Sequence, residues 1–202
     1  MDRFVITGPT PLTGELAVSG AKNAVLPLMA ASLLSRGESV ISRVPDLQDV
    51  RFFMVLLEGL GARCHLAGGT LRIDTTDAVG CEAPYDLVRK MRASIYVLGP
   101  LLAAAGAARV SLPGGCAWGP RPVNLHLEGM RALGAELQLN EGYIEGRVHG
   151  RLRGGRFRFL PSSVGGTANV LMAAVLAEGV TELDNCAVEP EVTQLAEALV
   201  AA

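Results

Sequence analysis

The residues best suited to chemistry lie in one stretch rich in glycine and proline, LPGGCAWGPRP at 112–122. It places Cys116 five positions before Arg121. A thiol becomes reactive when a nearby cation or helix amide stabilises its thiolate. A loop of this length between packed elements is typical of a functional segment. The same sequence is equally compatible with a cysteine that serves only as a small apolar residue in a turn. Both interpretations of Cys116 stay open on local chemistry alone.

Two further cations precede apolar, helix-forming runs. Lys22 opens KNAVLPLMAASLL, Arg92 opens RASIYVLGPLLAAAG, and a third run follows the turn Ser163-Val164-Gly165. Serine caps helix amides well, and the amino end of a helix attracts anions through its free N–H groups and its dipole. Simple capping explains any one of these starts. Three of them around one axis would instead form a single anion-binding focus.

These runs belong to an internal repeat. Gly37, Gly106 and Gly179 each separate an Ala/Leu-rich helix from an alternating strand. A second apolar helix follows in each copy, and in the first two copies a glycine-containing hairpin comes next. The unit reads strand–helix–strand–helix–strand–strand, and its third copy is expected to break off after its second helix. We therefore interpret the chain as a fragment of a longer fold.

Composition narrows the class of protein. The chain has 202 residues, half of them hydrophobic, and 18 basic against 20 acidic residues give a net charge of −2. This indicates a globular protein without general affinity for nucleic acid or acidic membrane surfaces. The arginine-rich stretch at 147–158 alternates with apolar residues, which is typical of strands with a solvated face. No apolar stretch is long enough to predict a membrane span.

The remaining cysteines and histidines are interpreted as structural or solvent-facing. Neither type shows the spacing of zinc ligands, and reduced thiols with a cytoplasmic location fit the composition best. The residues concerned are Cys64, Cys81, Cys186, His65, His126 and His149.

Four long motifs carry a resemblance that runs along the whole chain: SGAKNAVLPLMAASLL, APYDLVRKMRASIYVLGPLLA, VSLPGGCAWGPRPVNLHLEGMRALGAE and VGGTANVLMAAVLAEGVTELDNCAVEPEV. They resemble the UDP-N-acetylglucosamine 1-carboxyvinyltransferases of the enolpyruvyl transferase family, over the first half of such an enzyme. The resemblance implies a mixed α/β fold, an inverse α/β barrel or prism built from repeated βαβαββ units. Helices would lie inside and sheets outside, with an incomplete third repeat. Residues 1–20 would pair with the absent carboxyl-terminal lobe, and 21–202 would form the amino-terminal lobe.

The resemblance also implies a reaction. Enolpyruvyl would move from phosphoenolpyruvate to the 3′-hydroxyl of UDP-N-acetylglucosamine with release of phosphate, the first committed step of peptidoglycan synthesis. No metal or organic cofactor is implied. The implied partners are the two substrates and the carboxyl-terminal lobe, with no nucleic acid and no membrane. That lobe supplies the base for the sugar hydroxyl, so this chain is expected to be inactive alone.

The family's site residues carry over to matching positions. Cys116 would be the acid that protonates the enolpyruvyl methylene, and the target of fosfomycin. Lys22, Arg92 and Arg121 would hold phosphoenolpyruvate or its phosphate. The positions implied to bind the sugar nucleotide are Asn23, then Arg121, Pro122, Val123, Asn124 and Leu125 at the uridine, and Ser163, Val164 and Gly165 at the diphosphate.

Two departures and two alternatives accompany this assignment. Asn124 stands where the family usually has an aspartate, which changes the donors offered to the uracil, and Trp118 is bulkier than the usual aliphatic residue. A shikimate 3-phosphate enolpyruvyl transferase would share the fold, although the run GGCAWGPRPVNLH argues against it. A non-catalytic module of the same fold is the third interpretation, and the incomplete third repeat supports it.

Overall fold

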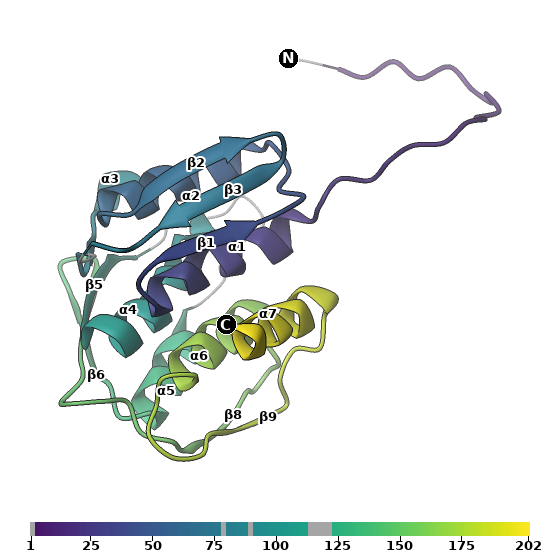
Figure 1. Ribbon diagram of the computed structural model, residues 1–202. Coiled ribbons are helices and arrows are strands. Elements are labelled where there is room, and N and C mark those ends of the chain that lie inside the picture. The colour runs from purple at the N-terminus through teal and green to yellow at the C-terminus, as the bar shows by residue number, and fades with distance from the viewer. Residues whose placement is uncertain (1–2, 78–79, 89–90, 113–122) are drawn as a thin grey trace.

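The computed structural model describes residues 3–77, 80–88, 91–112 and 123–202 of the chain. Three β-sheets lie on the outside of the molecule, and helices fill the space between them (Figure 1). Buried side chains from all three copies of the repeat belong to one hydrophobic cluster. The predicted mixed α/β architecture, with helices inside and sheets outside, is therefore confirmed.

The first copy of the repeat contains two helices, a short 3-10 segment and a three-stranded sheet. Its elements are α1 (Lys22–Ala31), η1 (Ser32–Leu34), β1 (Glu38–Ile41), α2 (Gln48–Gly59), β2 (Arg63–Ala67) and β3 (Thr70–Asp74).

The second copy contains every element of the predicted unit, and the third contains its first four. The second copy comprises β4 (Glu82–Ala83), α3 (Tyr85–Val88), η2 (Arg92–Val97), α4 (Leu98–Ala105), β5 (Ala107–Ser111), α5 (Asn124–Ala132), β6 (Glu136–Asn140) and β7 (Tyr143–Arg147). The third comprises β8 (Arg156–Arg158), α6 (Val164–Ala174), β9 (Glu182–Asp184) and α7 (Pro190–Ala201).

The copies build matching sheets. The strand order is β1–β3–β2 in the first copy and β4–β5–β7–β6 in the second, so the two hairpins occupy equivalent places. β4 runs parallel to β5, and β8 runs parallel to β9, as strands joined by a crossover helix do. The other paired strands are antiparallel. The order of elements read from the sequence is thus confirmed in the second copy and, for its first four elements, in the third, and the predicted hairpins are present in the first two copies.

Glycines shape both kinds of turn in the unit. Gly37, Gly106 and Gly179 have φ of 129°, 71° and 91°, a region that side chains avoid and that ends a helix. The hairpins reverse at Gly68-Gly69 and Glu141-Gly142, where both central residues have positive φ. Such turns match the twist of the two strands they join. The predicted helix ends and hairpins follow from these few backbone positions.

Helix α6 packs closely against α4 and α5 because glycines face it. A Cβ placed on Gly99 would lie 2.5 Å from the side-chain oxygen of Asn169 and closer still to its carbonyl oxygen. A Cβ on Gly129 would overlap a methyl group of Val170. The backbones of α4 and α5 therefore lie in close contact with α6 at Gly99 and Gly129, and neither position has space for a larger residue.

Serine capping is confirmed in only one of the three copies. The Ser163 side chain accepts a hydrogen bond from the Gly166 N–H at the start of α6. Helix α1 begins after Ala21 and η2 begins after Met91, and neither residue supplies a side-chain cap. Ser19 instead donates to the carbonyl of its neighbour Gly20. The amino ends of α1 and η2 therefore keep uncapped N–H groups.

Residues 3–18 form an extended arm that leaves the body of the molecule (Figure 1). The alternation of apolar and polar residues there predicts a strand, but the described part of the chain offers no strand beside it, and a strand needs such a partner. Its apolar side chains are exposed, with Phe4 at 98% and Leu12 at 93%. The body begins where Gly20 packs against the carbonyl of Arg43. The implied pairing of residues 1–20 with another lobe stays a prediction.

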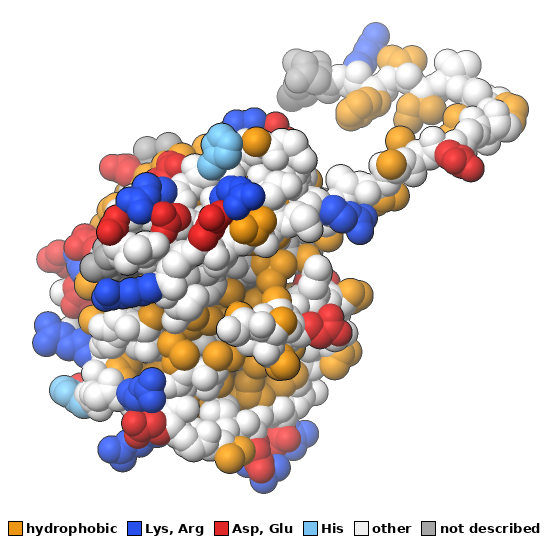
Figure 2. Space-filling model, in the orientation of Figure 1, with side chains coloured by type: hydrophobic (Ala, Val, Ile, Leu, Met, Phe, Trp, Pro, Cys, Tyr) orange, Lys and Arg blue, Asp and Glu red, His pale blue; other side chains and the backbone are white. Residues whose placement is uncertain are grey.

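A second exposed apolar surface lies on the body itself. Figure 2 shows hydrophobic side chains gathered across the helical face between the first sheet and α7. Large exposed apolar side chains near α6 and on α7 include Val175, Val180, Val188 and Val200.

Candidate functional site

The charged residues singled out in the sequence lie at the amino ends of the inner helices. Lys22 is the first residue of α1, Arg92 is the first of η2, and Ser163 immediately precedes α6. Segment η2 contacts both α1 and α6. The three carboxyl ends meet at the opposite end of the core, around the cavity described below. The amino ends therefore face the same side, as the repeat predicts.

Lys22 is held by an acid of the neighbouring helix. Its Nζ lies 2.7 Å from a carboxylate oxygen of Asp49 in the first turn of α2, and about half of its side chain is exposed. Asn23 beside it is exposed, and its side chain makes no hydrogen bond with the described residues. Pro27 removes the N–H that would bond the Asn23 carbonyl. An ammonium group, an amide and a backbone acceptor thus lie together at the start of α1.

Arg92 is close to two buried rings. Burial, together with the charge of Arg92, lowers the pKa of His126 to about 4. Burial and the charge of Glu191 raise the pKa of Tyr96, which Arg92 opposes. Both rings are therefore neutral at pH 7, and the charge of the Arg92 guanidinium acts on both of them. Glu191 lies in the first turn of α7, so the start of that helix also faces this side.

The start of α6 meets the same two rings. A Cβ placed on Gly165 would lie 3.3 Å from Cε1 and Nε2 of His126 and 3.7 Å from the Tyr96 hydroxyl. The Ser163–Gly165 turn is half-buried. Because Arg92 interacts with both rings, the structure brings this arginine and the turn to one place. Paired N–H groups beside a guanidinium suit a phosphate or another oxyanion.

Three of the residues expected to bind the uridine, Val123, Asn124 and Leu125, lie in the described part of the chain, and their side chains differ in exposure. Leu125 is buried at 8% exposure, so its side chain belongs to the core. Val123 packs against the same cluster as the residue before α5. Asn124 is exposed, and its amide donates to Glu128 one turn along the helix at 3.3 Å. Asn124 is therefore the side chain of the three that is open to a ligand.

Cys116, Arg121 and Pro122 lie outside the described residues. The chain around them leaves the described part at Leu112, just after β5, and re-enters it at Val123. His126 lies in the first turn of the helix that follows this stretch in the sequence. The proposed roles of its residues stay predictions.

Sequence reasoning missed three members of the site: Tyr96, His126 and Asn169. His126 was expected to be structural, which its burial supports, but its position beside Arg92 and Gly165 places it in the site as well. Asn169 is a fully buried amide inside the apolar run TANVLMAA. An unexplained polar residue in a buried helix is the signal that could have drawn attention to it, because such groups need hydrogen-bond partners.

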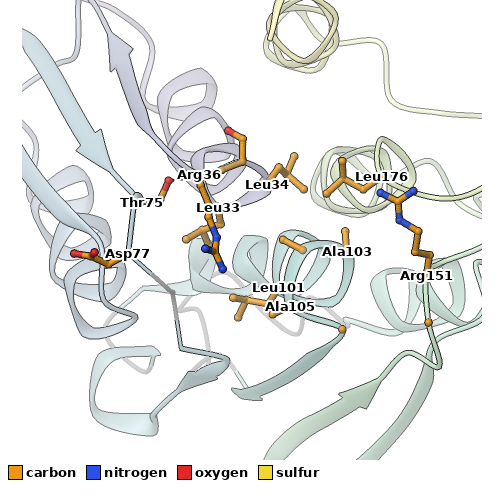
Figure 3. A pocket seen from close by; sticks show the side chains of 14 residues that line it. Leu33, Leu34, Arg36, Thr75, Asp77, Leu101, Ala103, Ala105, Arg151 and Leu176 are labelled. Carbon is orange, nitrogen blue, oxygen red and sulfur yellow. Dashed lines mark hydrogen bonds between the residues drawn. The ribbon is translucent and has the colours of Figure 1, made fainter.

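A cavity of about 550 Å³ lies at the other end of the core. It is bounded by the carboxyl ends of the inner helices, at Leu34, Ala103 to Ala105 and Leu176, and by Arg36 and Arg151 (Figure 3). Helix α1 is 10 residues long, so this cavity and Lys22 are separated by at least one helix length, about 15 Å. It therefore shares no residue with the candidate site.

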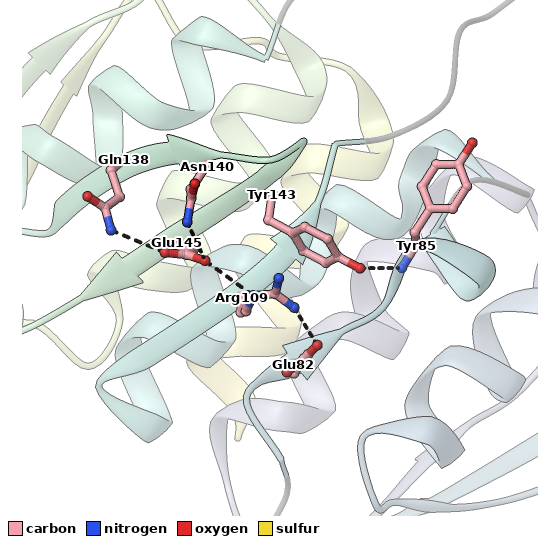
Figure 4. A network of polar contacts seen from close by, with 7 residues as sticks. All are labelled: Glu82, Tyr85, Arg109, Gln138, Asn140, Tyr143 and Glu145. Atoms are coloured by element: carbon pink, nitrogen blue, oxygen red, sulfur yellow. Dashed lines mark hydrogen bonds and ion pairs between the residues drawn. The ribbon is translucent and has the colours of Figure 1, made fainter.

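The outer face of the second sheet carries a separate polar network (Figure 4). Arg109 lies 2.5 Å from Glu82 and 3.2 Å from Glu145, and its guanidinium sits 3.7 Å from the centre of the Tyr143 ring. The Tyr143 hydroxyl accepts from the backbone N–H of Tyr85. These contacts tie β4 to β7 across β5. The network is structural, and exposed ion pairs of this kind each contribute little to stability.

Two of the described thiols, Cys64 and Cys186, do not have the properties of catalytic ones. Burial and the nearby charge of Glu58 raise the pKa of Cys64 to about 12, and burial also raises the pKa of Cys186. A thiol in such surroundings stays protonated and inert. Among the described residues, no group of three or more His, Cys, Asp and Glu could hold a metal ion. No described helix combines the length and apolarity of a membrane-crossing one.

Comparison with known proteins agrees with the fold. Residues 6–202 match the family model described as EPSP synthase (3-phosphoshikimate 1-carboxyvinyltransferase). The chain belongs to this family of enolpyruvyl transferases. Two solved members share the fold. The enolpyruvyl transferase NikO from Streptomyces tendae gives a TM-score of 0.81 at 23% identity over 94% of this chain and 44% of its own. EPSP synthase from Acinetobacter baumannii gives 0.68 at 17% identity, over 89% and 42%.

Curated relatives are much closer in sequence. UDP-N-acetylglucosamine 1-carboxyvinyltransferase from Prosthecochloris aestuarii is 54% identical over 203 residues, which cover 100% of this chain and 48% of the relative. The enzymes of the same name from Shewanella denitrificans and Anaeromyxobacter sp. are 54% and 55% identical, with 48% and 49% of their lengths covered. The chain thus spans about half the length of the relatives it matches.

The cap on α6 gives a direct test of how the turn at Ser163–Gly165 is held. Ser163→Ala should lower the free energy of unfolding by about 1 kcal/mol, because the Gly166 N–H loses its acceptor. Ser162→Ala is the matched control, since Ser162 is exposed and makes no hydrogen bond with the described residues. Urea unfolding of both variants measures the difference. Equal midpoints would show that the cap does not hold the turn.

Proposed function

We propose that this chain is the amino-terminal lobe of an enzyme that transfers enolpyruvyl from phosphoenolpyruvate to the 3′-hydroxyl of UDP-N-acetylglucosamine. The observation that carries the proposal is the 54% identity, along the whole chain, to relatives of that name. The reaction releases phosphate and serves peptidoglycan synthesis, and a cytoplasmic location suits both of its substrates. The carboxyl-terminal lobe of the same enzyme is the partner that completes the site.

The geometry of the described residues supports anionic substrates. Phosphoenolpyruvate and a nucleoside diphosphate both need fixed cations and free N–H groups. Lys22 and Arg92 supply cations at adjacent helix starts. The turn at Ser163–Gly165 supplies backbone donors beside Arg92. Asn23 and Asn124 present exposed amides for the sugar and the uracil.

The cysteine loop completes the proposed chemistry. Cys116 would give a proton to the enolpyruvyl methylene as the sugar hydroxyl adds, and Arg121 would hold the phosphoenolpyruvate anion. Proton transfer from a positioned group lowers the barrier of such an addition. The thiolate of Cys116 would then take back a proton from the resulting methyl group, and phosphate would leave as the double bond re-forms. In this proposal the base that accepts the sugar hydroxyl proton comes from the carboxyl-terminal lobe.

Binding to the chain itself tests the proposal. In ¹H–¹⁵N spectra, UDP-N-acetylglucosamine should shift the amide signals of Val123, Asn124 and Gly165, and shikimate 3-phosphate should leave Val123 and Asn124 in place. The reverse selectivity would favour the shikimate enzyme, whose name the family model carries. No response to either ligand would favour a non-catalytic module. Phosphate release from phosphoenolpyruvate, once the carboxyl-terminal half of the Prosthecochloris aestuarii relative is added, would extend the test to catalysis.

Removal of the central guanidinium should weaken this binding. Arg92→Ala is expected to raise the dissociation constant of UDP-N-acetylglucosamine about tenfold, because the guanidinium, which lies close to the rings beside the Ser163–Gly165 turn, is proposed to bond the diphosphate as well as the phosphate of phosphoenolpyruvate. Arg158→Ala removes an arginine from the outer strand β8 and serves as the matched control. Chemical-shift titration of the parent and both variants gives the three constants. A constant for Arg92→Ala equal to that of the control would remove Arg92 from the site.

A further inference from the structure

A buried amide on α6 joins this helix to three other helical segments. Asn169 is completely buried in the middle of α6. Its Oδ1 accepts from the Gly99 N–H at 2.7 Å, and its Nδ2 donates to the Ile95 carbonyl at 2.8 Å. The same Nδ2 lies 3.0 Å from Nδ1 of His126 at the start of α5. One side chain thus connects η2, α4, α5 and α6.

These bonds fix where the proton of His126 resides. The Gly99 N–H can only donate, so the Asn169 atom facing it is the oxygen. The other amide atom is then NH₂, and its two hydrogens point to the Ile95 carbonyl and to His126. Nδ1 of His126 must therefore accept. A neutral imidazole that accepts at Nδ1 carries its proton on Nε2.

The protonated nitrogen faces the start of α6. Gly165 lies against Nε2 and Cε1 of His126, and the Tyr96 hydroxyl flanks the same glycine. The ring of His126 is 5% exposed. Nε2 makes no hydrogen bond with the described residues. It is not one of the fully buried polar atoms that lack a partner, so part of its surface is accessible. A buried ring therefore aims an unused donor at the turn where the proposed function places the diphosphate.

The charges around the ring keep it neutral. Arg92 on η2 is the charged group that acts on it, together with burial, and Asn169 on α6 contributes only a dipole. Glu191 on α7 acts on the neighbouring Tyr96. A neutral imidazole with a fixed proton is a directional donor, whereas a protonated one would repel Arg92.

We propose that Asn169 is a positioning residue that locks the Nε2–H tautomer of His126, so that this N–H donates to a phosphate oxygen bound at the start of α6. The ligand part of this inference rests on the proposed function. The tautomer part does not, since it follows from the hydrogen bonds of the protein alone.

Histidine-selective ¹⁵N spectra of the full 202-residue chain test the tautomer. The chain has only three histidines, so His126 is assigned by its loss in His126→Gln. The parent should show a protonated Nε2 and an unprotonated Nδ1 at pH 7. Asn169→Asp removes the donor, so Nδ1 of His126 should take the proton and donate to the carboxylate. Asn140→Asp makes the same change on the outer sheet and should leave the His126 pattern as in the parent.

A protonated Nδ1 in the parent would overturn the lock, and so would an unchanged tautomer in folded Asn169→Asp. If Asn169→Asp does not fold, the parent spectrum decides alone. Inorganic pyrophosphate then tests the donor. It should shift the His126 Nε2 signal in the parent and bind about tenfold more weakly to Asn169→Asp. An Nε2 signal that ignores pyrophosphate would overturn the donor role. A signal that responds to pyrophosphate but not to UDP-N-acetylglucosamine would instead contradict the proposed function and leave the inference standing.

Discussion

The free energy of unfolding should fall by about 3 kcal/mol between pH 6.5 and pH 4 through the titration of His126 alone. Its pKa is about 4 in the folded chain against the ordinary 6.5, because the ring is buried and lies near Arg92. Between these values the unfolded chain binds a proton that the folded chain excludes. Stability therefore falls as the pH falls, by about 1.4 kcal/mol for each unit, and is unaffected by this residue above pH 6.5.

Urea unfolding at steps of half a pH unit measures this effect. His126→Gln should show a shallower loss of stability over the same interval than the parent does. Hydrogen-bonded carboxylates such as Asp46 and Glu145, whose pKa values are lowered by their arginine partners, also lose stabilisation in acid. They are common to both proteins, so the difference between the curves isolates His126. His149→Gln is the control for loss of a surface imidazole. Parallel curves for the parent and His126→Gln would contradict the prediction.

Gly99→Ala should lower the free energy of unfolding by about 2 kcal/mol. The added methyl would lie 2.5 Å from the side-chain oxygen of Asn169 and even nearer its backbone carbonyl, so α4 must move away from α6. Overpacking of a tight core costs on the order of 1–3 kcal/mol. The displacement also stretches the bond from the Gly99 N–H to Asn169. Alanine's better helix propensity, about 1 kcal/mol, offsets only part of this loss.

The matched control for Gly99→Ala is Gly8→Ala, because a Cβ at Gly8 meets nothing within 4 Å. Thermal and urea unfolding of both variants give the two changes in stability. The His126 signal provides a second measurement, because a displaced α4 should disturb the Asn169 bonds and hence the ring. A loss below about 1 kcal/mol at position 99 would show that the two helices can separate at little cost.

The fold could be predicted largely because its signals are local and occur more than once. Gly37, Gly106 and Gly179 mark the same helix end in each copy, and their positive φ explains why glycine stands there. The hairpins carry glycine where the turn requires it. Residues 1–9 also alternate like a strand, yet residues 3–9, which the structure describes, form none. Alternation indicates which faces a strand would have, but pairing depends on a partner elsewhere.

The candidate site could be predicted only in part, because its contacts join residues that lie far apart in the sequence. Lys22 and Arg92 were identified by their positions at helix starts, and the structure places them there. Nothing near Lys22 in the sequence indicates that Asp49 pairs with it. Likewise the bond from Asn169 to His126 spans 43 residues. A polar residue in an apolar helix signals that a partner exists, but only the packing of the helices identifies that partner.

The repeated backbone carries chemistry that is not repeated. Ten residues before the shared glycine, the three copies have Pro27, Tyr96 and Asn169. Pro27 leaves the Asn23 carbonyl without its helical donor, and Tyr96 places its hydroxyl beside Gly165. Asn169 bonds the imidazole of His126. An ancestor with identical copies would have offered three equal surfaces to its ligand. In this chain the equivalent positions carry three different side chains, so the helix of one copy could not replace that of another without loss of its contacts.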